Sequence, residues 1–208
     1  MPDRVQPVPE LLPDELSLAA LREVAAGCRA CDLWSRATQT VFGEGPESAR
    51  VLMVGEQPGD QEDRAGRPFV GPAGQVLDQA LEAAAIDRSL VYVTNVVKHF
   101  KWTSRGKRRI HERPDREEIS ACIPWLEAEV ATVKPDVIVC LGATAAQALL
   151  GSDFRVTRQR GQIMASTFGA PIMATVHPSS ILRARDDQSR REAMESFIAD
   201  LRHLRAYL

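Results

Sequence analysis

Short apolar runs alternate with segments of helical periodicity along most of this chain, and this alternation is the feature that most limits its fold. Apolar runs predict strands at residues 51–54, 91–97, 136–141, 162–165 and 171–176. Apolar residues at helical spacing predict helices at residues 15–26, 75–85, 117–133, 143–150 and 189–207. Strands that alternate with helices predict an α/β fold, with helices on both faces of a mostly parallel, doubly wound sheet.

The composition is that of a soluble globular protein with one domain. The chain has 208 residues, of which 44% are hydrophobic and 26% are charged, and these values exclude a disordered chain. Its apolar runs are too short or too rich in small residues to span a bilayer, and no signal peptide opens it. We therefore expect an intracellular, cytoplasmic protein without a membrane partner. Residues 1–14 contain four prolines and no periodicity, which predicts a flexible arm before a single domain at 15–208.

Positive charge is concentrated in residues 98–113, which contain seven lysines or arginines and one acid. The remaining residues carry 19 basic and 27 acidic side chains, so the chain as a whole has a formal net charge of −2. A basic loop on an acidic body favours a polyanion such as nucleic acid as its partner, and a solvated surface loop is the alternative. His111 lies inside this loop, in the sequence GKRRIHER.

Polar residues follow the carboxyl ends of three predicted strands, where doubly wound sheets bind their ligands. Glu56 and Gln57 follow the first strand in the sequence GEQPG, and Asn95 in VTNVVK carries an amide that can pair with the edge of a base. His177 in HPSSIL can donate to a ligand oxygen, and Leu182 can wedge into a base stack. Taken singly, these residues also fit a solvated loop glutamate, a turn asparagine and a satisfied loop histidine.

Four cysteines suggest a centre built from soft ligands. Cys28 and Cys31 form a C-x2-C pair, and Cys122 and Cys140 lie far downstream. A second C-x2-C pair is absent, so the pattern is not that of an ordinary zinc ribbon. Ligands gathered from distant points suit an iron-sulfur cluster. The alternatives are a buried structural pair or a redox C-x-x-C motif, and the latter is disfavoured because no strand precedes Cys28.

Six motifs in order resemble the iron-sulfur uracil-DNA glycosylases of family 4, from about Cys28 onwards. They are VFGEG, VLMVGEQPG, GRPFVGPAG, VTNVVK, KPDVIVCLGATAA and TVHPS. The insert KRRIH, and GEQPG in place of GEAPG, resemble the UdgX subgroup of these DNA repair enzymes. The resemblance implies a four-stranded parallel sheet between helices, in three α/β/α layers with an added cluster-binding region. It further implies a monomer, associated with a bacterial nucleoid, whose partner is uracil-containing DNA with single strands preferred.

The resemblance also implies a role for each matching residue. It places four residues in the uracil pocket, namely Gly55, Phe69, Asn95 and His177. Phe69 would stack on the uracil ring, Asn95 would read its amide edge, and His177 would donate to the uracil O2. Glu56 would act near the sugar as a base or electrostatic stabiliser, with Gln57 beside it as a further catalytic residue.

The resemblance implies a 4Fe-4S cluster, but this chain departs from the usual ligand pattern. Family 4 proteins carry a third cysteine directly after Val-Val-Lys, where this chain has His99. The predicted ligands are Cys28, Cys31, His99 and Cys122. Cys140, inside a predicted strand, replaces His99 in the rival set.

The implied function is excision of uracil from DNA followed by self-trapping. Glycosylases take the base out of the stack, and cleavage leaves an oxocarbenium-like centre at C1′ of the sugar. We expect a neutral His111 to attack this centre and stay attached, in a single turnover. Predicted DNA contacts are Lys107, Arg108, Arg109, Ser179 and Leu182. One alternative is a family 4 glycosylase that turns over and uses the basic loop only to bind DNA, and another is a non-catalytic iron-sulfur module that binds DNA.

Overall fold

A five-stranded sheet forms the centre of the chain in the computed structural model, which describes residues 6–208. The strands of this sheet are β1 (Val51–Gly55), β2 (Val91–Asn95), β5 (Val137–Leu141), β6 (Ile163–Met164) and β7 (Ile172–Thr175). They lie in the order β2-β1-β5-β7-β6, and every neighbouring pair is parallel except β7 and β6. The prediction of a mostly parallel sheet between helices is confirmed. The two-residue strand β6 adds an antiparallel edge to the four parallel strands that were expected.

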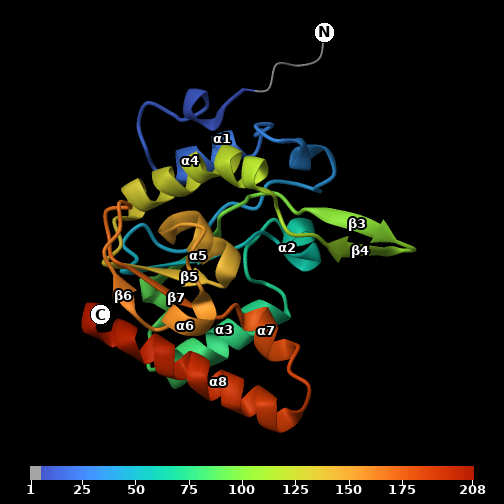
Figure 1. Ribbon diagram of the computed structural model, residues 1–208. Helices are drawn as coiled ribbons and strands as arrows, with labels where there is room; N and C mark the ends of the chain where they lie inside the picture. The colour runs from blue at the N-terminus through green and yellow to red at the C-terminus, as the bar shows by residue number, and fades with distance from the viewer. Residues whose placement is uncertain (1–5) are drawn as a thin grey trace.

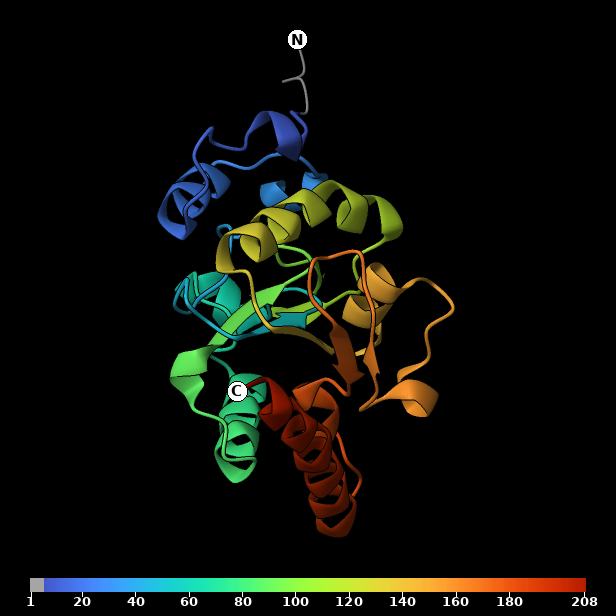
Figure 2. The same cartoon turned by 90° about the vertical axis from the view of Figure 1, so that its left-hand side faces the viewer.

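Helices cover both faces of this sheet (Figure 1). One face carries α1 (Leu18–Ala25), α4 (Arg116–Val133) and α5 (Ala143–Leu150), and the other carries α3 (Pro72–Ala83), α7 (Pro178–Leu182) and α8 (Asp187–Arg202). Figure 2 shows the same three layers from the side. The shorter elements are α2 (Asp60–Ala65), α6 (Val156–Gln159) and the 3-10 turns Val8–Glu10, Asp32–Ser35, Arg88–Leu90 and His203–Tyr207.

Strand β1 shows how the sequence creates two cores. Its side chains alternate between the two faces of the sheet, as in any strand. Leu52 and Val54 lie in the core under α1, α4 and α5, whereas Val51 and Met53 lie in the core against α3 and α8. All four are fully buried. Burial of each such side chain stabilises the fold by about 1.5–3 kcal/mol, so an all-apolar run is needed at the centre of a three-layer fold.

The predicted N-terminal arm at residues 1–14 is partly folded. Val8 is fully buried in the core beside α1 and α4, and Leu11 and Leu12 pack against the same core. Residues 8–12 of the predicted arm therefore pack against the core, although the sequence there has no apolar periodicity. Residues 1–5 of the arm lie outside the described part of the chain.

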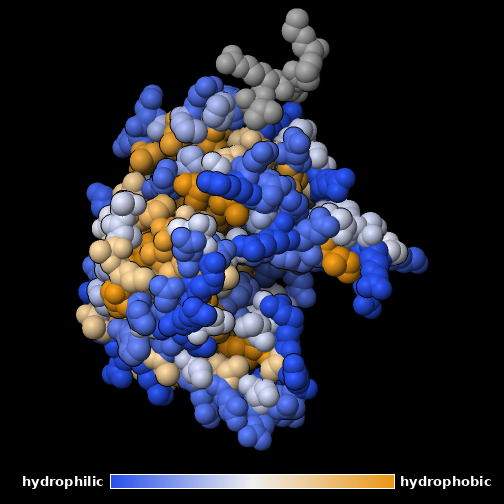
Figure 3. Space-filling model, in the orientation of Figure 1, coloured by the Kyte–Doolittle hydropathy of each residue, from blue (hydrophilic) through white to orange (hydrophobic). Residues whose placement is uncertain are grey.

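The basic stretch forms a β-hairpin, whereas the sequence predicted a loop. Strands β3 (Trp102–Arg105) and β4 (Arg108–His111) pair antiparallel and project from the body of the molecule (Figure 1). Most of their side chains are exposed, and Figure 3 shows hydrophilic, intermediate and hydrophobic residues together on this projection. The sequence of β3 and β4 therefore lacks the alternation of apolar and polar residues by which strands are predicted. The two-residue connection begins at Gly106, whose φ of 62° lies in the left-handed region, and this glycine was the available signal for a hairpin.

Two element boundaries differ from the prediction because of local hydrogen bonds. Helix α8 begins at Asp187, since the carboxylate of Asp186 accepts from the backbone N–H of Ser189 at 2.7 Å, and it ends at Arg202 rather than 207. Strand β2 ends at Asn95, so this residue stands at the exact edge where the strand leaves the sheet. Among residues 6–208, no helix has both the length and the apolar character needed to cross a bilayer.

Candidate active site

Segments that leave the carboxyl ends of the four parallel strands surround a cavity of about 800 Å³. Seven residues that the sequence analysis singled out line it, namely Glu56, Gln57, Phe69, Asn95, His111, His177 and Ser179. They come from positions spread over more than half of the chain, and the parallel sheet brings them together. A second cavity, of about 530 Å³, lies between the end of α4 and residues 167–170 and contains none of these residues.

Glu56 lies directly after β1, and its two carboxylate oxygens have different partners. Oε2 accepts a short hydrogen bond from the hydroxyl of Thr144, and Oε1 lies 3.3 Å from Nε2 of His111. Burial opposes ionisation of Glu56, but the hydrogen bonds from His111 and Thr144 outweigh it, so the pKa of Glu56 lies below its ordinary value. Glu56 is therefore an anion at neutral pH. No pattern in the sequence points to Thr144.

His177 precedes α7 and acts as its N-cap. Its Nδ1 accepts from the backbone N–H of Ser179 at 3.1 Å and lies 2.8 Å from the Ser179 hydroxyl. Burial lowers the pKa of His177 to about 4, so the ring is neutral at neutral pH. A neutral ring that accepts at Nδ1 carries its proton on Nε2. His177 is thus a hydrogen-bond donor on the wall of the cavity.

Phe69 and Asn95 occupy space that two glycines leave open. Phe69 has a φ of 54°, and a Cβ on Gly74 would lie 1.7 Å from the Phe69 carbonyl oxygen. A Cβ on Gly55 would lie 2.3 Å from Oδ1 of Asn95 and 2.9 Å from the ring of Phe69. The ring of Phe69 lies 6.2 Å from that of His177, at an interplanar angle of 26°. Because Gly55 has no side chain, Phe69 and Asn95 can approach the backbone of β1 at the wall of the cavity.

Gln57 fastens the base of the β3–β4 hairpin. Its amide Nε2 donates to the carbonyl oxygens of Lys101, at 3.2 Å, and Glu112, at 2.9 Å. Its Oε1 accepts from the backbone N–H of Lys101 at 3.0 Å. Gln57 was predicted as a catalytic residue beside Glu56. The structure instead occupies its amide with the backbone on both sides of the hairpin.

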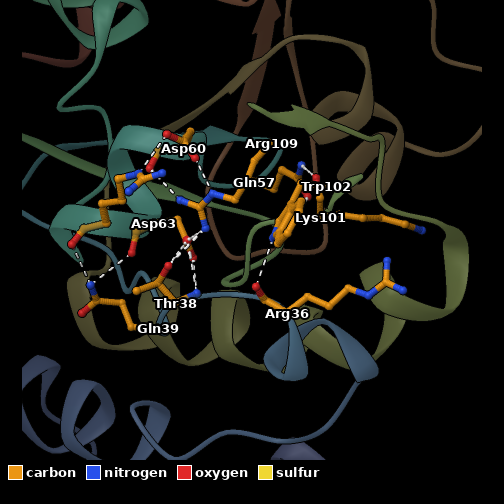
Figure 4. Close-up of polar contacts among 10 residues, drawn as sticks. Arg36, Thr38, Gln39, Gln57, Asp60, Asp63, Lys101, Trp102 and Arg109 are labelled. Carbon is orange, nitrogen blue, oxygen red and sulfur yellow. Dashed lines mark hydrogen bonds and ion pairs between the residues drawn. The ribbon is translucent and has the colours of Figure 1, made fainter. Parts of the chain in front are cut away.

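Arg109 fastens the body of the hairpin to α2, as Figure 4 shows. Its guanidinium forms ion pairs with Asp60 and with the fully buried Asp63, whose Oδ2 lies 2.6 Å from Nη1. The same carboxylate of Asp63 accepts from the backbone N–H of Thr38 at 2.9 Å. Arg109 was predicted to contact DNA. That contact stays a prediction, and in the structure the guanidinium is already paired with both aspartates.

The spacing of the sequence R-x-H places Arg109 and His111 on the same face of β4, since residues two apart in a strand share a face. The side chain of Arg109 is 14% exposed and points at the body, so His111 also faces the body. The ring of His111 remains 49% exposed and lies 6.1 Å from that of Phe100. Gln57 and Arg109 thus hold the hairpin so that His111 faces Glu56.

The other predicted DNA contacts lie on the hairpin and on α7. Lys107 and Arg108 are exposed at the tip of the hairpin, and Leu182, at the end of α7, is 40% exposed. Ser179 lines the cavity, where its hydroxyl accepts from Arg183 at 3.0 Å.

Three of the predicted metal ligands, Cys28, Cys31 and Cys122, lie in or against the core that α1 and α4 cover. The indole N–H of Trp125 donates to Sγ of Cys28 at 3.3 Å, and the backbone N–H of Lys98 donates to Sγ of Cys122 at 3.2 Å. The pKa of Cys122 is raised to about 12, chiefly by burial and to a smaller extent by Cys31 and Cys28. Burial likewise raises the pKa of Cys31 to about 11. Thiols are soft donors of the kind that hold iron-sulfur clusters.

Neither candidate for the fourth ligand joins these thiols. The ring of His99 is buried, with Nε2 lying 2.9 Å from the hydroxyl of Thr40, and burial lowers its pKa to about 4 against the effect of Asp63. Cys140 is fully buried in the middle of β5, where burial alone raises its pKa. Within residues 6–208, no three His, Cys, Asp or Glu side chains are arranged so that they hold a metal ion.

Comparisons with known proteins identify the family of the chain. Residues 42–202 match the model of the Uracil DNA glycosylase superfamily. The type-4 uracil-DNA glycosylase of Thermotoga maritima is 40% identical over 169 residues, which is 81% of this chain and 84% of that protein. The type-4 enzyme of Pyrobaculum aerophilum is 36% identical over 81% of this chain and 86% of its own length. That of Sulfurisphaera tokodaii is 34% identical, over 80% of this chain and 76% of its own.

Proposed function

Because the chain belongs to the uracil DNA glycosylase superfamily, we propose that it excises uracil from DNA and is then trapped on its product through His111. The observation that carries the proposal is the contact between Nε2 of His111 and Oε1 of Glu56, at 3.3 Å, on the wall of the cavity. An imidazole beside a carboxylate is a nucleophile beside its base.

Three cavity residues recognise the extruded base in this proposal. Phe69 stacks on the uracil ring, and the amide of Asn95 pairs with its N3–H and O4. His177 donates from Nε2 to the uracil O2, where negative charge develops as the bond to the sugar breaks. The contact that occupies its Nδ1, and the pKa of about 4, support this role because both favour a neutral ring with a proton on Nε2.

Cleavage then follows the general course of glycoside chemistry. The bond between N1 of uracil and C1′ breaks, and its electron pair leaves with the base as the uracil anion. The sugar becomes oxocarbenium-like, and the ionised Glu56 stabilises this positive charge. The low pKa of Glu56 supports this role, since only the anion stabilises a cation.

His111 captures the sugar before water does. As the new bond forms between Nε2 and C1′, the Nε2 proton passes to Oε1 of Glu56 and is then available to the uracil anion. Atoms and charges balance, because free uracil and an N-alkylated, neutral imidazole are the products. This imidazole is a poor leaving group, so the protein stays attached to the abasic site.

Lys107 and Arg108 hold DNA phosphates near the cavity, and Ser179 and Leu182 contact the strand on the opposite side. The exposure of Lys107, Arg108 and Leu182, and the position of Ser179 on the cavity wall, support these roles. Arg109 contributes through the position of the hairpin instead.

Cys28, Cys31 and Cys122 are the proposed thiolate ligands of a 4Fe-4S cluster, with His99 as the fourth ligand. His99 directly follows Lys98, whose backbone N–H donates to Sγ of Cys122, and this adjacency supports the choice of His99. When bound, the cluster supplies a structural link between α4 and residues 28–31. Cys122→Ala is expected to abolish the iron content and the absorbance near 400 nm, and retention of that absorbance in His99→Ala contradicts the choice of His99.

A glycosylase that turns over is the second candidate, and the type-4 relatives favour it. A labelled single-stranded oligonucleotide with one uracil distinguishes the two candidates on a denaturing gel. Trapping predicts a shifted protein–DNA band at one equivalent of enzyme, lost in His111→Ser, which still releases uracil. Free abasic DNA without a shifted band, produced over many turnovers, contradicts trapping. Absence of free uracil in every condition supports the non-catalytic module.

A further inference from the structure

Thr144 is a buried hydroxyl at the start of α5 that the proposed chemistry does not yet use. It is the second residue of the helix, lines the cavity, and is 5% exposed. Its hydroxyl donates to Oε2 of Glu56. This is a long-range contact between two elements, because 88 residues separate Thr144 from Glu56.

The start of α5 is itself fixed against the far side of the cavity. The backbone N–H of Gly142 donates to the carbonyl oxygen of Thr175 in β7 at 2.9 Å. Gly142 has a φ of 96°, and a Cβ there would lie 3.0 Å from Cβ of His177. Thr144 therefore connects Glu56 to the start of α5, which also packs closely against His177.

A glutamate carboxylate turns readily about its last torsion, since that torsion has only a broad preference. Here Oε2 is occupied by Thr144, and Oε1 is left to face Nε2 of His111 at 3.3 Å. Without Thr144, either oxygen is free to face His111, and the plane of the carboxylate is no longer defined.

We propose that Thr144 is a positioning residue for Glu56, which turns one carboxylate oxygen toward His111 and the sugar and keeps the group ionised. The role at the sugar rests on the proposed function, whereas the effect on Glu56 itself does not. A donated hydrogen bond stabilises the charged form of a carboxylate, so its loss favours the protonated form.

The other charged and titratable groups around Glu56 remain the same when Thr144 is changed. They are His111 of β4, His177 before α7, Glu62 of α2, and Arg113 and Arg183 at the rim of the cavity. A difference between the wild type and a Thr144 variant therefore reports on the hydroxyl.

Titration of the full-length chain by NMR tests the proposal directly. Glutamates are labelled with 13C at the carboxyl carbon, and the resonance of Glu56 is assigned by its loss in Glu56→Gln. In Thr144→Val, which keeps the shape of the side chain, the pKa of Glu56 is expected to rise by about one unit, as expected for loss of one hydrogen bond to a charged group. Thr144→Ser keeps the hydroxyl and is expected to restore the wild-type titration.

Single-turnover uracil release at pH 8 is the second readout. Thr144→Val is expected to lower the rate constant about tenfold with unchanged affinity for the oligonucleotide, and Thr144→Ser to recover most of it. An unchanged pKa of Glu56, or an unchanged rate in Thr144→Val, overturns the proposal. If the wild type releases no uracil, the proposed function fails, but the titration still decides whether Thr144 controls Glu56.

Discussion

Replacing Gln57 by alanine should separate capture of the sugar from excision of the base. The variant removes three hydrogen bonds that join the base of the hairpin to the body, with lengths from 2.9 to 3.2 Å. Each such bond contributes about 1 kcal/mol, so the attached position of the hairpin loses at most about 3 kcal/mol, or about 100-fold in population. The contacts of Arg109 with Asp60 and Asp63 remain and reduce this loss.

The expected result is a changed ratio between two products. Formation of the covalent adduct should slow by about 10- to 100-fold in Gln57→Ala, because His111 spends less time beside Glu56. Release of uracil should slow by less than about threefold, because Glu56, Asn95 and His177 are held by other elements.

The assay measures both products from the same reaction, with adduct on a denaturing gel and free uracil by chromatography. Thr103→Ala serves as the matched control, since it changes an exposed side chain of the same hairpin and should leave the ratio unchanged. If Gln57→Ala forms adduct and uracil in the wild-type ratio, the hairpin base does not control the position of His111, and the reasoning is refuted.

Gly55→Ala should lower single-turnover uracil release by at least about 100-fold with a small loss of stability, because the added Cβ displaces the amide of Asn95. Wild-type kinetics in this variant would contradict the close approach of Asn95 to the backbone of Gly55. For His177, the folded-state pKa of about 4 lies below the unfolded value near 6.5, so its contribution to stability is complete above pH 6.5 and is lost as the pH falls toward 4. Urea unfolding should accordingly show that wild type loses about 3 kcal/mol more than His177→Gln between pH 7.5 and pH 4, and equal losses exclude this origin. Lys107→Ala and Arg108→Ala should each reduce the salt dependence of DNA binding by about one counterion, measured by fluorescence anisotropy against salt concentration, and an unchanged slope means that neither side chain contacts a phosphate.

The site residues at the strand ends were predictable from the sequence, because ligand sites of parallel sheets lie at the carboxyl ends of the strands. Glu56, Asn95 and His177 each follow an apolar run, and parallel strands bring their carboxyl ends to one edge of the sheet. The cavity gathers these three residues as that rule requires.

The contacts of the hairpin were not predictable in the same way. A count of charges treats Arg109 like Lys107, and it does not reveal that Asp60 and Asp63 of α2 lie within reach of one and not the other. The same limit applies to Thr144, because the chain forms β2 and β5 before the Thr144 hydroxyl reaches Glu56. Such pairings between distant residues depend on the folded arrangement and leave no periodic signal.

The hairpin leaves the body between β2 and α4 and returns to the same place, with Lys101 and Glu112 both bonded to one glutamine side chain. It is therefore a self-contained insertion of ten residues, 102–111, that shares no strand with the central sheet. An exchange confined to residues 102–111 alters which group faces Glu56 and leaves Asn95 and His177, which belong to other elements, in their positions. The imidazole at this position can thus be replaced by a local change, without rebuilding the sheet that carries Glu56.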